Sequence, residues 1–187
     1  MRTVRLVASA MAVALGFPGA ARAQDTPKAG IVIAYPTAFG VLWHASDKIA
    51  IRPEFSVSGT SSSLTITTGT PVVTDSSGWS AGFGLSALFY LHTQDSLRTY
   101  FVPRFTYSHA SSSVNSTAAA ALTSDTGSDS YGGSGAFGAQ YGLGKRFALF
   151  GELGFGYEHH TADTSSGGTI KGSTWGLRSG VGVVFYP

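Results

Sequence analysis

Residues 80–92 read Ser-Ala-Gly-Phe-Gly-Leu-Ser-Ala-Leu-Phe-Tyr-Leu-His, and this stretch decides the fold. Successive side chains of a β-strand point to opposite faces. One face of such a strand carries Ala81, Phe83, Leu85, Ala87, Phe89 and Leu91. The other face carries Gly82, Gly84, Ser86, Leu88, Tyr90 and His92. The alternation predicts a β-strand with one apolar face and one face of mostly small residues.

The same alternation recurs along the chain, and no window shows a sustained helical period. Further strands are predicted at residues 30–35, 38–45, the stretch after Ile49, 97–110, 131–143, 147–159 and 173–186. We divide the first stretch at Pro36-Thr37, because single-chain bacterial barrels have an even number of strands. The sequence therefore predicts an all-β fold, an eight-stranded antiparallel up-and-down transmembrane β-barrel.

The connections between these segments differ in length. Residues 46–48, 93–96 and 144–146 are tight polar turns, whereas residues 64–77, 112–130 and 161–170 are long, polar and without periodicity. Short turns at one end and long loops at the other are typical of a membrane barrel. Pro53 and Pro103 lack the N–H that a closed ladder needs, so we expect a β-bulge at each.

The 187 residues have room for one domain after a leader. Residues 1–23 resemble a secretory signal peptide, with a basic start, an apolar stretch and a small-residue cleavage site, and the barrel domain is expected at residues 24–187. Loss of the three leader arginines leaves nine basic against ten acidic residues. Nucleic acid is therefore not an expected partner. Cysteine is absent, which excludes disulfides and thiolate metal sites.

The charged residues decide which face points inward, because a cation facing lipid near the midplane costs about 2–4 kcal/mol. The small-residue face is thus expected to line the lumen. It carries an expected lumen ion network, either a packing plug or a gate, made of Arg52, Glu54, Arg98, Arg104, Glu152, Glu158 and Arg178. The lumen of eight strands is just wide enough for side chains to fill.

Aromatic residues near the predicted strand ends fit a girdle where lipid meets water. The expected girdle comprises Trp43, Trp79, Trp175, Tyr107 and Tyr157. The alternative is a soluble lipocalin-like barrel, which would turn these aromatics inward and leave the strand glycines in water.

The chain resembles the small outer-membrane barrels of the OmpA/OmpX-like type from about residue 30 to residue 186. In that family the last strand is an alternating insertion signal, which Leu177, Val181, Val183 and Phe185 resemble, although Tyr186-Pro187 follow. The resemblance implies a Gram-negative-type outer membrane as location. It also implies lipopolysaccharide and the barrel assembly machinery as partners, and a monomer with an envelope-integrity or adhesion role through its loops. The alternative is a narrow, porin-like channel.

Catalytic and cofactor chemistry has weak support, and we expect no enzyme, cofactor or metal. His109-Ala110-Ser111 is similar to the His-x-Ser pair of the lipid A deacylases, but no carboxylate is placed to orient the imidazole. His159 and His160 are adjacent, so in a strand they point to opposite faces and cannot converge on a metal. The glycines at residues 132–135 lack the Lys-Ser/Thr of a phosphate loop.

Overall fold

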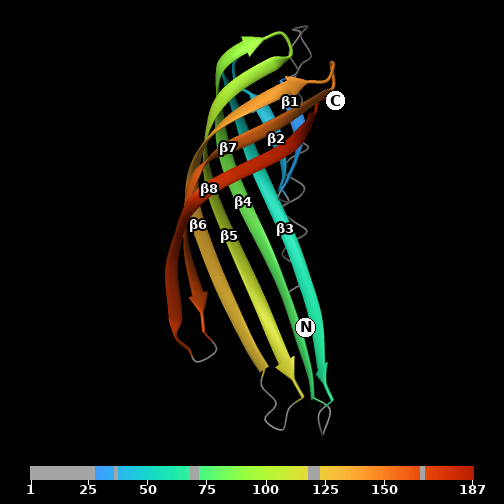
Figure 1. Ribbon diagram of the computed structural model, residues 1–187, viewed down its shortest axis with the longest axis vertical. Helices are drawn as coiled ribbons and strands as arrows, with labels where there is room; N and C mark the ends of the chain where they lie inside the picture. Colours follow the sequence, from blue (N-terminus) through green and yellow to red (C-terminus); the bar gives the residue numbers. More distant parts are fainter. Residues whose placement is uncertain (1–27, 36–37, 68–71, 118–122, 165–166) are drawn as a thin grey trace.

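The computed structural model describes residues 28–35, 38–67, 72–117, 123–164 and 167–187. Each strand pairs antiparallel with the next, and β1 pairs with β8 to close the ring (Figure 1). The strands are β1 (Ala29–Tyr35), β2 (Ala38–His44), β3 (Ile49–Ile66), β4 (Val72–Gln94), β5 (Leu97–Ser116), β6 (Thr123–Gly142), β7 (Phe147–Asp163) and β8 (Thr169–Phe185). The prediction of eight up-and-down antiparallel strands is confirmed. The predicted signal peptide lies outside the described residues.

Odd-numbered side chains of the strands point outward and even-numbered ones inward, as the alternation predicts, except after the register shift near the end of β4. The outward face carries a broad belt of exposed large apolar residues on every strand, including Ile33, Phe39, Phe55, Phe83, Phe105, Phe137, Leu153 and Leu177. Soluble monomers rarely expose a contiguous apolar surface of this extent. A bilayer is the environment that would cover it. The described residues contain no helix long and apolar enough to cross a membrane.

The inside of the barrel is filled at the end where the short turns lie. The buried apolar core there consists of inward-facing side chains from all eight strands: Val32, Leu42, Ala50, Leu88, Tyr90, Tyr100, Val102, Ala136, Ala148, Phe150 and Val184, with Tyr186 just after β8. Leu42, Leu88, Val102 and Val184 are 1% exposed. The lumen at this level is therefore a packed core.

Most residues assigned to long loops lie in strands instead, so that prediction is wrong. β3 and β4 pair as far as Ile66↔Val72, and β5 and β6 pair as far as Asn115↔Thr123. β3 to β6 run well past the other strands (Figure 1). Ser and Thr occupy both faces in these extensions, so no apolar face signals a strand. The backbone ladder and paired hydroxyls hold them together.

The bulges expected at Pro53 and Pro103 are also absent from the described strands. The β2–β3 register is the same on both sides of Pro53, with Gly40↔Glu54 before it and Trp43↔Ile51 after it. A missing N–H therefore interrupts the ladder without an inserted residue. The register shift between Tyr90 and His92 of β4 is the irregularity that the pairing does show.

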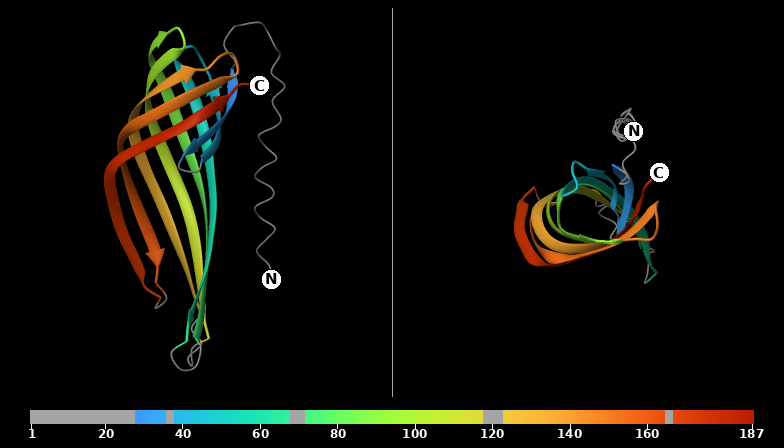
Figure 2. Two further views of the ribbon diagram at one scale, coloured as in Figure 1. Left: turned by 45° about the vertical axis from the view of Figure 1, so that its right-hand side comes forward. Right: turned by 90° about the horizontal axis from the view of Figure 1, so that it is seen from above.

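The wall of the barrel is incomplete beyond the end of the short first hairpin that faces away from the tight turns. β1 and β2 have seven residues each, and their last pairs with the neighbouring strands are Tyr35↔Val181 and Phe39↔Phe55. Beyond these pairs, residues 56–66 of β3 and 169–180 of β8 have a strand partner on one side only among the described residues. Figure 2 shows β1 and β2 confined to the end near the C-terminus. We call this gap between β3 and β8 the notch.

Candidate functional site

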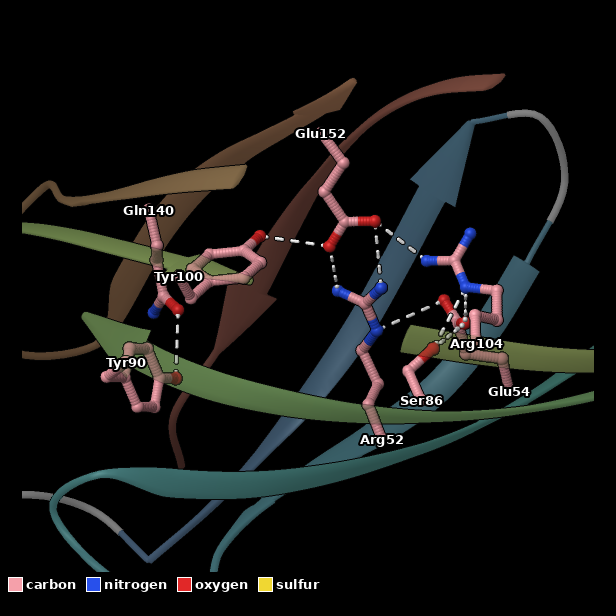
Figure 3. A network of polar contacts seen from close by, with 8 residues as sticks. All are labelled: Arg52, Glu54, Ser86, Tyr90, Tyr100, Arg104, Gln140 and Glu152. Carbon is pink, nitrogen blue, oxygen red and sulfur yellow. Dashed lines mark hydrogen bonds and ion pairs between the residues drawn. The ribbon is translucent and has the colours of Figure 1, made fainter. Parts of the chain in front are cut away.

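Four charged side chains meet inside the barrel directly above the apolar core. Arg52 and Glu54 come from β3, Arg104 from β5 and Glu152 from β7 (Figure 3). Glu152 accepts from Arg52 Nη1 at 2.8 Å and from Arg104 Nη2 at 2.8 Å. Glu54 pairs with Arg52 Nε at 3.3 Å and with Arg104 Nε at 3.1 Å. We call these four residues the plug cluster.

Neighbouring polar groups extend the hydrogen bonding of the plug cluster. Tyr100 donates its hydroxyl to Glu152 Oε1 at 3.0 Å. The Ser86 hydroxyl accepts from Arg104 Nε at 2.9 Å and donates to Glu54 Oε2 at 3.2 Å. Two cations and two anions balance, which is the condition under which buried charge is tolerated. Figure 3 shows these contacts spanning the lumen from β3 to β7.

A second polar group lies near the short turns. His44 Nε2 is 3.0 Å from the Tyr90 hydroxyl, and Gln140 donates to the Tyr186 hydroxyl at 2.9 Å. Arg98 lies over the Tyr90 ring, 5.7 Å from its centroid. Arg98 thus contacts this aromatic group and not the plug cluster.

A third group lies on the other side of the plug cluster. Arg178 Nη2 of β8 donates to Glu158 Oε2 of β7 at 2.7 Å, and both side chains are partly exposed. The seven predicted lumen charges therefore form three separate groups. The sequence analysis did not include Tyr100, Ser86 and Gln140 among the site residues. Each lies on the inward face with the charges, so the alternation of side chains could have identified it.

A cavity of about 340 Å³ lies over the plug cluster and is lined by residues of all eight strands. Glu54, Arg104 and Glu152 form part of its floor. Its walls are glycine- and serine-rich, and the Arg178–Glu158 pair projects from one side. Tyr35 and Ala38, at the top of the first hairpin, also line it, so the cavity reaches the notch. We call this cavity the cup.

The five aromatic residues expected in a girdle all point outward and are exposed: Trp43, Trp79, Tyr107, Tyr157 and Trp175. Trp43 lies at the turn end, and the other four lie toward the opposite end. The pairs Tyr107↔Tyr131 and Tyr157↔Trp175 place three tyrosines and a tryptophan close together. Exposed Tyr131 and Tyr141 were missed, although they face outward by the same parity.

His109 has the carboxylate partner that the sequence did not place. Asp129 Oδ1 is 2.9 Å from His109 Nδ1 and accepts the Tyr107 hydroxyl at 2.7 Å. The hydrogen bond from Tyr107 lowers the pKa of Asp129 below its ordinary value, and the bond to His109 adds to this. Ser111 lies on the same outward face, but no contact joins it to the imidazole among the described side chains. The arrangement orients a histidine and shows no activated nucleophile.

No group of three metal-ligating side chains occurs in the part of the chain that the structure describes. His159 Nδ1 is 3.0 Å from the Ser173 hydroxyl on the outward face, while His160 points inward beside Gly172. The glycines at residues 132–135 lie within β6, where the absence of Cβ atoms gives space to the neighbouring strands. A Cβ at Gly132 would collide with the carbonyl oxygen of Tyr157.

Comparisons with known proteins find similarity in structure but none in sequence. No protein-family model and no curated protein sequence matches the chain. A major outer membrane protein of Thermus thermophilus superposes with a TM-score of 0.52 at 13% identity, over 84% of this chain and 98% of that one. Acinetobacter baumannii CarO superposes at 0.43 with 14% identity, over 89% and 100%. The Yersinia pestis attachment invasion locus protein Ail superposes at 0.38 with 12% identity, over 84% and 94%.

Identities this low establish the fold alone. The closed ring of eight antiparallel strands, the outward apolar belt and the superposition on the Thermus protein agree with one another. The chain has the fold of an eight-stranded outer-membrane β-barrel.

Proposed function

We propose that the chain is an integral outer-membrane protein whose sealed barrel anchors a polar sheet at the cell surface, in a surface-interaction and envelope role. The extension of β3 to β6 past the apolar belt carries the proposal. Cross-strand hydroxyl contacts stiffen it, among them Ser77 to Ser113 at 2.8 Å and Ser112 to Thr126 at 2.8 Å. A stiff, hydroxyl-rich sheet outside the membrane, which carries Asp75, Asp125 and Asp129 as its charges, has the character of a contact surface.

The packed interior supports a sealed barrel over the alternative of a narrow channel. The apolar core fills the turn end, and the plug cluster lies on top of it with Arg52 at 1% exposure. A conducting path would require both the apolar core and the plug cluster to move. The same proposal includes export through a cleaved leader, insertion by the barrel assembly machinery, contact with lipopolysaccharide and a monomeric state.

The accessibility of an inserted epitope to antibody tests the location of the protein and its orientation in the membrane. An epitope inserted between β5 and β6 is expected to bind antibody on intact cells. The matched insertion at Asp95, in the tight turn between β4 and β5, is expected to bind antibody only after lysis. The opposite pattern, or equal labelling of both sites, would overturn the orientation.

Attachment tests the role of the extension. In the shortened variant, residues 62–76 are replaced by an Asn-Gly turn, so that the β3–β4 hairpin ends at the Ser61↔Ser77 pair. Cells carrying this variant should keep a heat-modifiable, folded barrel and lose attachment to coated surfaces relative to cells carrying the full chain. Equal attachment of cells carrying the shortened variant and cells carrying the full chain would contradict the proposed surface role.

Conductance separates the sealed barrel from the channel. Purified protein in a planar bilayer is expected to be silent, and so is the Glu152→Gln variant, because the apolar core lies below the substituted side chain. Discrete openings of the wild-type protein, altered by Glu152→Gln, would establish the channel instead.

A further inference from the structure

We propose that the cup and the notch together form a binding site for a single-chain amphiphile with an anionic head group. The head group lies in the cup against Arg178 and Arg104, and the chain leaves sideways through the notch into the outer leaflet. This inference goes beyond a surface role, since it concerns the interior of the barrel and its lateral opening.

The notch lies at the depth of the apolar belt. Trp175 and Leu177 of β8 and Val57 of β3 are strongly exposed on the outward face beside it. Tyr35 and Phe39 border the notch at the end of the first hairpin, and both are exposed. A tilted membrane strand uses about 9–11 residues. With seven each, β1 and β2 stop short of the outer rim.

The strand edges at the notch need polar partners. Unpaired backbone N–H and C=O groups in a bilayer cost several kcal/mol each. Residues 178–180 of β8 and Ser56 of β3 have no second strand partner among the described residues, and they line the cup. The head group of an amphiphile can pair with the edge groups that border the cup, while its apolar chain lies in the hydrocarbon belt.

The charge most exposed in the cup is the Arg178 guanidinium, although two arginines and three glutamates line the cup. Its two cations are accessible, with 51% of the Arg178 side chain and 28% of the Arg104 side chain exposed. The carboxylates that balance Arg104 are almost covered, at 7% for Glu54 and 4% for Glu152. Glu158 is the one partly exposed carboxylate among the described cup residues. Arginine pairs with carboxylate and phosphate oxygens through two parallel hydrogen bonds.

The cup has the capacity for a head group. A volume of about 340 Å³ is at the lower end of the range of small-molecule pockets, about 300–1,000 Å³. The space exists because the wall next to the notch carries glycine. A Cβ at Gly180 would find its nearest neighbours at 3.7 Å, the Tyr35 carbonyl oxygen, and 4.0 Å, Glu152 Oε2. A larger side chain at this position would therefore enter the cup without straining the strand.

Quenching of Trp175 by a brominated chain tests the site. The chain has three tryptophans, so Trp43→Phe with Trp79→Phe leaves Trp175 as the reporter, two residues from Leu177. The protein is held in phosphatidylcholine nanodiscs and titrated with terminally brominated dodecanoate. The controls are brominated dodecyl maltoside, which has a neutral head, and acetate in competition, which has no chain.

Saturable quenching by the brominated dodecanoate is expected, with the maltoside giving only a linear, partition-like signal and acetate failing to compete. Arg178→Gln should weaken the saturable binding about tenfold, the loss of one charge-assisted contact. Glu158→Gln is the matched control on the same ion pair and should leave binding unchanged or tighter. Gly180→Leu should abolish the saturable component while the fold, followed by heat-dependent gel mobility, stays intact.

Three results would overturn the proposal. Equal quenching by the anionic and neutral probes would show partition into the bilayer only. Competition by acetate equal to that of unlabelled dodecanoate would show a site for free anions that does not use the notch. Unchanged binding in both Arg178→Gln and Gly180→Leu would place the amphiphile elsewhere. None of these results affects the epitope or attachment tests of the surface role.

Discussion

Substitution of Glu152 by glutamine should destabilise the barrel far more than the same substitution at Glu158. Glu152 holds both Arg52 and Arg104, and the plug cluster is neutral only with both carboxylates ionised. Glu152→Gln leaves a net positive charge next to Arg52, whose side chain is 2% exposed. Removal of one partner from a buried pair costs about 3–5 kcal/mol. Arg52 keeps Glu54 at 3.3 Å, so we expect the lower end, about 3 kcal/mol.

Glu158→Gln removes the same charge from a pair whose members are both partly exposed, and such pairs contribute about 0–1 kcal/mol. The assay is reversible urea unfolding in lipid vesicles, followed by tryptophan fluorescence. With a slope of about 2 kcal/mol per molar urea, the midpoint should fall by about 1.5 M for Glu152→Gln and by less than about 0.5 M for Glu158→Gln.

A double-mutant cycle tests the charge argument itself. Arg104→Gln restores neutrality in the background of Glu152→Gln, so the double variant should be more stable than the sum of the two single losses predicts. Equal midpoints for the Glu152 and Glu158 variants, or strict additivity in the cycle, would refute the reasoning from burial and charge balance.

Three further outcomes follow from the same geometry. Gly154→Ala should cost about 1–3 kcal/mol in urea unfolding, because its Cβ would collide with the backbone of β6, while Gly151→Ala, with no atom within 4 Å of its Cβ, should be neutral. Phe137→Lys puts a cation in the middle of the outward belt and should cost about 2–4 kcal/mol in vesicles, but little if a soluble barrel were correct. Tyr107→Phe should raise the pKa of Asp129 toward its ordinary value, as measured by NMR titration of the carboxyl group, because the lost hydrogen bond stabilises the charged form. In the wild type, the contact that lowers this pKa stabilises the fold at neutral pH, and its contribution disappears as the pH falls through the folded-state value. An unchanged pKa in the variant would show that the contact is absent in solution.

The sequence predicted the strand count and the inward and outward faces, because alternation with period two is a local signal. Even the short first hairpin was placed at residues 30–35 and 38–45, close to the observed Ala29–Tyr35 and Ala38–His44. The polar extensions were mistaken for loops because burial on one face is what produces alternation, and Ser and Thr on both faces remove it.

The candidate site was predicted less completely than the fold, for physical reasons. The alternation of side chains places Arg52, Arg98 and Arg178 on the inward face of the wall. It does not give their positions along the barrel axis, because the strands are tilted. The position along the barrel axis decides which charges meet, and this position depends on the register between strands. The contact of His109 with Asp129 was missed because residue 129 was assigned to a loop, whereas it lies in β6 and pairs with His109.

The seam between β1 and β8 also bears on how the barrel forms. It joins residues 31–35 to residues 181–185 through five pairs, whereas β3 and β4 share eighteen. The seam joins the two strands farthest apart in sequence, so its closure carries the largest loop entropy and gains few backbone contacts in return. We therefore expect ring closure to be the last and slowest step of folding, preceded by a curved hairpin sheet that is already complete from β3 to β8. Until that step, an open sheet with two free edges is the species most exposed to pairing with other chains. A chaperone or an insertion machine would contribute most during that interval.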